Sequence, residues 1–103
     1  MADPNKRLAV LEKMVAAGQV DSFALYALGM EYRRAARVED SLATFKNLRE
    51  RDAGYLPMYL MVGQMLTEHG RQEEATEWLR AGIELAREKG DMKALGELEG
   101  ALP

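Results

Sequence analysis

The segment LYALGMEY at residues 25–32 decides the fold, because it returns in altered form as YLMVGQML at residues 59–66. The resemblance continues downstream, where a small residue and then a large apolar one follow each copy. The matching pairs, each 34 residues apart, are Leu25 and Tyr59, Leu28 and Val62, Gly29 and Gly63, Tyr32 and Leu66, Ser41 and Ala75, and Phe45 and Leu79. A fixed period of this length predicts an architecture of stacked repeats.

The remainder of the chain predicts helices throughout and gives no strand signal. Apolar residues recur at spacings of three and four, as on one face of a helix, from Leu8 to Val15 and again in five later segments. Asp3 and Pro4 fit the start of the first helix, while Gly18 and Gly70 fit helix ends. We therefore expect an all-α fold of about six helices, with connections short enough to make neighbouring helices antiparallel.

These residues resemble the tetratricopeptide repeat (TPR), a helix–turn–helix unit of 34 residues, and in particular its small bacterial-type members. The resemblance implies one TPR-like domain spanning residues 1–103, built as an α-solenoid. Its parts would be an N-terminal half-repeat helix at 1–20, repeats at 22–54 and 56–89, and a C-terminal capping helix at 90–103. Three positions depart from the family pattern: Arg7 and Leu48 replace small residues, and Ala53 replaces a proline.

Gly29 and Gly63 support this reading independently of the resemblance. A glycine inside a helix costs about 1 kcal/mol relative to alanine, and here one recurs at the same place in both copies. We expect a paired helix to cross closely at each glycine, with Ser41 and Ala75 as the small residues that face it.

Composition and charge narrow the classes of function that we expect of the chain. The 103 residues carry a net charge of −3 with acidic and basic residues mixed along the chain, which argues against a nucleic-acid partner. The chain has no cysteine, and no stretch approaches the ~20 apolar residues of a membrane helix. A cytoplasmic protein that contacts no membrane is the default expectation.

The resemblance implies that the first helix of each repeat lines a concave groove. The residues placed there are Phe23, Tyr26, Met30, Arg33 and Arg34 from the first repeat, and Leu60, Met61, Gln64, Thr67 and Glu68 from the second. Aromatic residues and methionine suit a protein-binding surface, although Tyr26 and Met61 could instead pack as core. We expect an apolar helix or extended segment of a partner protein as the ligand, because the lysines and asparagines of the family's carboxylate clamp are absent.

Two rival functions remain. The chain could be a structural protein that self-associates as a homo-oligomer or joins a larger assembly, through the groove or through the last helix with Met92, Leu95, Leu98 and Leu102. Catalysis finds little support: His69 is the sole histidine and fits a helix C-terminus better than a base or metal ligand. We therefore expect no enzyme activity, no catalytic residue, no cofactor and no metal.

Overall fold

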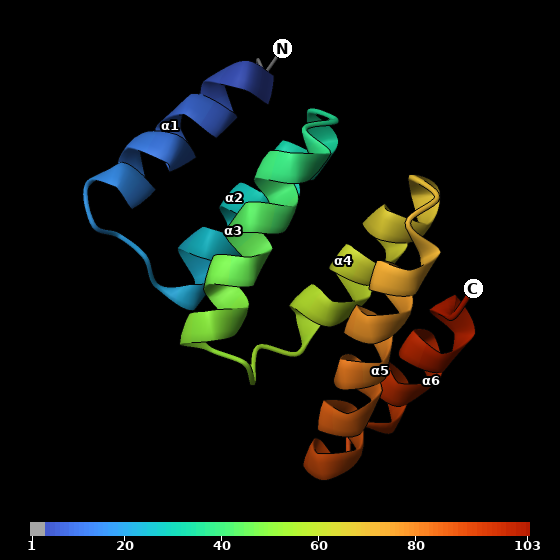
Figure 1. Cartoon of the computed structure of the whole chain (residues 1–103). Coiled ribbons are helices and arrows are strands. Elements are labelled where there is room, and N and C mark those ends of the chain that lie inside the picture. The colour runs from blue at the N-terminus through green and yellow to red at the C-terminus, as the bar shows by residue number, and fades with distance from the viewer. Residues whose placement is uncertain (1–3) are drawn as a thin grey trace. The chain divides into compact units, whose positions relative to one another are not determined.

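A computed structural model describes residues 4–103 of the chain, with side chains from residue 6 onward, so the predicted cap at Asp3 lies outside it. All regular structure in this range is helical, and the prediction of an all-α fold is confirmed (Figure 1). The helices form two compact units that divide between Tyr55 and Leu56. The two repeats expected from the sequence fall one in each unit.

The first unit contains α1 (Pro4–Ala16), α2 (Ser22–Arg34) and α3 (Val38–Arg51). Asp21 caps α2 by accepting a hydrogen bond from the backbone N–H of Ala24 at 2.9 Å. In this unit α2 packs against both α1 and α3 (Figure 1). The hairpin of α2 and α3 is antiparallel, since Ser22, at the start of α2, donates a hydrogen bond to Asp52, which follows α3, at 2.6 Å.

The second unit contains α4 (Pro57–Glu68), α5 (Gln72–Lys89) and α6 (Met92–Ala101). Pro57 stands at the first turn of α4, where a missing N–H costs nothing. Gly90 ends α5 in the left-handed conformation with a φ of 69°, and Asp91 then caps α6. Both α4 and α5 pack against α6.

Each hairpin closes on the glycine of its first helix. A β-carbon at residue 29 would lie 2.6 Å from Cζ of Phe45, and one at residue 63 would overlap the side chain of Leu79. Phe45 and Leu79 are fully buried. The predicted close crossing of paired helices is therefore confirmed at both glycines.

A third glycine contact was not predicted. A β-carbon at Gly82 in α5 would lie 2.6 Å from Cβ of Tyr59 and 2.9 Å from Cδ2 of Leu98. Gly82 therefore lets α5 approach α4 and α6 together. The indole of Trp78, one turn earlier in α5, is buried with its centroid 5.8 Å from that of the Tyr59 ring.

The turns inside the two hairpins are copies of each other. Arg37 precedes α3 and pairs with Asp40 at 2.8 Å; Arg71 precedes α5 and pairs with Glu74 at the same distance. The backbone N–H of each arginine also bonds back to the preceding helix, to the carbonyl oxygens of Tyr32 and Leu66 respectively. The repeat thus extends to its connecting turn.

The two turns differ in the residue that adopts a positive φ. Gly70 has a φ of 72°, in the left-handed region that glycine enters without steric cost. The matching residue of the first hairpin is Ala36, which has a φ of 59°. The same backbone path is therefore enforced on a residue that it does not suit.

Candidate protein-binding surface

The outer face of α2 combines apolar and basic side chains. Phe23 at its start is 73% exposed, and Tyr26 and Met30 follow on the same side, half-buried. Arg33 and Arg34 continue this side at the end of the helix, Arg33 half-buried and Arg34 exposed. We call these five residues the α2 face. All five lie outside the buried stripe of α2, and the groove that the sequence assigned to them stays a prediction.

Tyr26 is the best-anchored member of the α2 face. Its ring meets Phe45 edge-on at a centroid distance of 6.0 Å and lies 5.3 Å from the ring of Tyr55. Burial and the neighbouring Tyr55 raise the pKa of Tyr26 above its usual 10.0, against an opposing effect of Arg33. Tyr26 is therefore partly core and partly surface, as both sequence readings allowed.

Tyr55 extends this aromatic surface and was missed in the sequence reading. It sits in the loop after Gly54, outside both matched segments, so helical periodicity could not reveal it. The only available signal was an aromatic residue directly after a turn. The contact with Tyr26 makes it part of the same patch.

The corresponding side of α4 is less exposed and less aromatic. Leu60, Met61, Gln64 and Thr67 are half-buried and Glu68 is exposed. We call these five residues the α4 face. It presents apolar groups near the start of the helix and polar groups near its end.

The Thr67 hydroxyl is already engaged within its own helix. It donates a hydrogen bond to the carbonyl oxygen of Gly63 at 2.8 Å. In the first hairpin the matching carbonyl, that of Gly29, accepts its additional bond from Ser41 of the facing helix, also at 2.8 Å. Thr67 therefore bonds within its own helix at the position where Ser41 bonds across the first hairpin.

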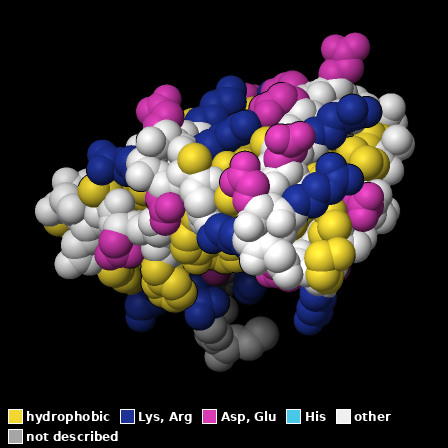
Figure 2. All heavy atoms as spheres, turned by 90° about the horizontal axis from the view of Figure 1, so that it is seen from below, with side chains coloured by type: hydrophobic (Ala, Val, Ile, Leu, Met, Phe, Trp, Pro, Cys, Tyr) yellow, Lys and Arg dark blue, Asp and Glu magenta, His cyan; other side chains and the backbone are white. Residues whose placement is uncertain are grey.

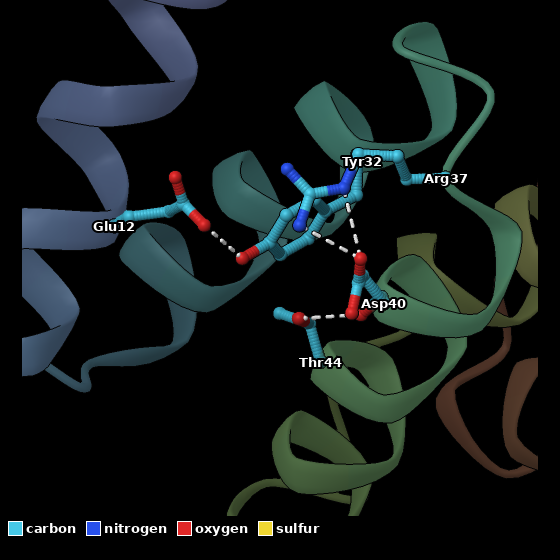
Figure 3. Close-up of polar contacts among 5 residues, drawn as sticks. All are labelled: Glu12, Tyr32, Arg37, Asp40 and Thr44. Carbon is cyan, nitrogen blue, oxygen red and sulfur yellow. Dashed lines mark hydrogen bonds and ion pairs between the residues drawn. The ribbon is translucent and has the colours of Figure 1, made fainter.

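A polar cluster connects α1, α2 and the turn to α3 (Figure 3). The Tyr32 hydroxyl donates to Oε2 of Glu12 at 2.6 Å, and the guanidinium of Arg37 lies 4.7 Å from the centre of the Tyr32 ring. Burial, followed by the bond to Glu12, raises the pKa of Tyr32 to about 12. This cluster attaches α1 to α2.

A second link between α1 and α2 involves a buried carboxylate. Glu31 is buried, and its Oε1 lies 3.5 Å from Nη1 of Arg7, whose side chain is 67% exposed. Arg7 occupies the position where the family pattern has a small residue. It reaches solvent as expected, and it also provides the cation that Glu31 needs.

The sole histidine of the chain, His69, lies at the C-terminus of α4. No group of three or more metal-ligating side chains occurs within residues 4–103. The His69 ring approaches the carbonyl oxygen of Met65 at 2.9 Å, at the C-terminus of α4. His69 therefore satisfies the helix end, as the sequence indicated.

Charge on the surface is mixed. Figure 2 shows Lys and Arg side chains interspersed with Asp and Glu side chains, with hydrophobic groups between them, on the face that it displays. No helix among the described residues is long and apolar enough to cross a membrane.

The solved structures that the chain resembles agree with the helical repeat described above. No protein-family model matches the chain, and a search of curated proteins gave no significant match. Among solved structures, the chain is similar to a tetratricopeptide repeat domain protein from Salinibacter ruber. In the solution NMR structure of that domain, the sequence is 36% identical to this chain and the TM-score is 0.72. The match covers 79% of this chain and 82% of the other. A crystal structure of it gives 36% identity and a TM-score of 0.71, covering 79% and 91%.

Proposed function

Because the chain belongs to the tetratricopeptide repeat family, we propose that it binds segments of partner proteins, on the α2 face in the first unit and on the α4 face in the second. Domains of this fold serve in general as protein-interaction modules rather than catalysts. For this chain we propose both the surface that binds and the kind of segment that it binds.

The exposure of Phe23 is the observation that carries the proposal. A phenylalanine that is 73% exposed at the start of α2 contributes nothing to the core of its own unit. It is continuous along the helix with Tyr26 and Met30, and aromatic residues and methionine are enriched where proteins bind one another. A large apolar group displayed in this way is typical of a binding surface.

The chemistry of the two faces suggests the kind of ligand. Both faces begin apolar; the α2 face ends in Arg33 and Arg34, and the α4 face ends in Thr67 and Glu68. We infer an apolar helical or extended segment with an acidic group near the end that meets the arginines. An acidic group there would gain from the two guanidinium charges.

The experiment compares capture of partner proteins by the wild-type chain and by Phe23→Glu from an extract of the native cells. We expect Phe23→Glu to lose the captured proteins while its thermal melt matches wild type, because the side chain is not part of the core. Met92→Glu, at a similarly exposed residue of α6, is the matched control and should capture normally. Identical capture by wild type and Phe23→Glu would contradict the assignment of the α2 face.

Self-association is the second candidate, and a separate observation favours it. The other large hydrophobic side chains exposed in the described range are Val10 of α1 and Met92 of α6. Both belong to the first and last helices rather than to the α2 or α4 face. Leu98, which the sequence suggested for such a contact, is buried against Gly82 and is not available.

A further inference from the structure

One side of α6 consists of an exposed methionine and two glycines. Met92 is 69% exposed, and Gly96 and Gly100 follow it at intervals of four residues on the same side. No atom of a described residue outside the local helix lies within 4 Å of where a β-carbon at either glycine would stand. In both hairpins, by contrast, the glycine of the first helix is covered by a large apolar side chain, Phe45 or Leu79.

The charged residues around this side of α6 are mostly acidic. Glu97, Glu99 and Lys93 flank it, Asp91 caps the helix, and Lys93 is the only basic residue in α6. Glu99 reaches Arg87 only at 4.0 Å, with both side chains more than half exposed. Residues 56–103 as a whole contain nine acidic and five basic residues.

The free side of α1 has the complementary character. Val10 is 51% exposed, with Lys6 and Lys13 one turn before and after it and Ala9 beside it. The opposite side of α1 faces α2 through Glu12 and the buried Leu8. The α1 helix holds three basic residues and one acidic residue, and that acidic residue is Glu12.

We propose that α6 of one chain binds α1 of a second copy, with Val10 lying over Gly96 and Gly100 next to Met92. Lys6 and Lys13 then approach Glu97 and Glu99. The glycines allow the two helices to approach closely, and Val10 takes the place that Phe45 and Leu79 take within the hairpins. Because each copy offers one α1 and one α6, the contact is head-to-tail and can be repeated from chain to chain.

The contact is small and partly electrostatic, and both properties can be measured. One helix on one helix buries less than the ~1,200 Å² of standard interfaces, so we expect association only at about 100 µM and above. Sedimentation velocity of the wild-type chain up to about 1 mM should show growing oligomers at low salt and fewer at ~0.5 M salt. A strict monomer over this range at low salt would overturn the proposal.

Two single variants test the two surfaces. Val10→Glu places a carboxylate against the acidic side of α6, and Gly96→Gln fills the space above α6. Each variant alone should associate at least about tenfold more weakly than wild type. Gly96→Gln should also melt no lower than wild type, because glutamine is a better helix former than glycine and meets no neighbour. Wild-type association by either variant alone would overturn the proposal.

Mixing the two variants distinguishes head-to-tail contact from other modes. Val10→Glu retains an intact α6 and Gly96→Gln retains an intact α1, so their mixture should form a 1:1 pair and stop there. If α6 paired with α6 instead, Val10→Glu alone would still dimerise. Phe23→Glu is the control for the α2 face and should self-associate like wild type, so a failed partner-capture assay and a failed assembly assay are separate results.

Discussion

Gly29 faces the ring of Phe45 so closely that no side chain fits at this position. A β-carbon there would stand between 2.6 and 2.9 Å from three ring carbons. Such distances require the ring or the helix to move. The contact fixes how near α2 and α3 lie to each other.

We expect Gly29→Ala to lower the free energy of unfolding by about 1–3 kcal/mol through overpacking, even though alanine is the better helix former. Urea denaturation followed by circular dichroism measures this change. Combining Gly29→Ala with Phe45→Leu should cost less than the two single changes together, because leucine relieves the clash. Gly96→Ala is the matched control, in open space, and should be neutral or stabilising; a loss of stability in Gly96→Ala equal to that in Gly29→Ala would contradict the steric explanation.

Ala36 should be improved by glycine. Its φ of 59° costs about 1–2 kcal/mol in a residue with a β-carbon, and part of this is offset because glycine makes the unfolded chain more flexible. We expect Ala36→Gly to raise the free energy of unfolding by about 0.5–1 kcal/mol. Ala35→Gly, at an ordinary φ of −80°, is the neighbouring control and should destabilise; a gain at residue 35 or a loss at residue 36 would refute the strain.

Burial of Tyr32 and its bond to Glu12 make part of the stability disappear at alkaline pH. Tyr32 has a pKa of about 12 in the folded chain against the ordinary 10.0 of tyrosine, so the folded state holds this proton more tightly. The resulting stabilisation is fully present below pH 10 and is lost as the pH rises from about 10 through about 12.

Tyr32→Phe removes both the hydroxyl and its titration. Near neutral pH it should lower the free energy of unfolding by about 0.5–1.5 kcal/mol, the usual range for one hydrogen bond. The difference between wild type and Tyr32→Phe should shrink between pH 10 and 12, as measured by urea denaturation at each pH. Tyr26, whose pKa is also raised, keeps some dependence in the variant. A difference that stays constant across this range would show that Tyr32 is not the group responsible.

Ser41→Ala tests the buried bond to the Gly29 carbonyl oxygen. Alanine already stands at the matching position, Ala75, where Thr67 provides the additional donor instead. Since the first hairpin has no such threonine, its carbonyl loses a partner, and we expect a cost of about 0.5–1.5 kcal/mol in thermal or urea unfolding. Ser41→Val should cost more, because its extra methyl group lies at a close crossing; equal stability of Ser41→Val and Ser41→Ala would refute the tight contact.

Apolar residues at spacings of three and four were enough to predict the helices, and the recurrence of a mid-helix glycine after 34 residues was enough to predict the crossings at Gly29 and Gly63. Both arise from local patterns. The left-handed Ala36 could have been inferred only by aligning it with Gly70, since alanine does not itself indicate a positive φ. The contact of Gly82 with Tyr59 and Leu98 depends on three helices meeting, which a spacing does not encode.

The residues of the candidate surface divide in the same way. Local sequence could place some of them, and only the folded chain places the others. Phe23 and Tyr26 could be placed on the outer side of α2 from helical periodicity alone. Tyr55 could not, because its position depends on the course of a loop. The links from Arg7 to Glu31 and from Tyr32 to Glu12 also escaped prediction, because they join helices through side chains whose direction only the folded chain fixes.

Trp78 is a fluorescent reporter of the second unit alone. It is the only tryptophan in the chain, and it is buried beside Tyr59 within the second unit. Its emission will follow loosening of α4 and α5, while far-ultraviolet ellipticity follows all six helices together. Whether the halves melt in step or in sequence can thus be observed in the unlabelled natural chain.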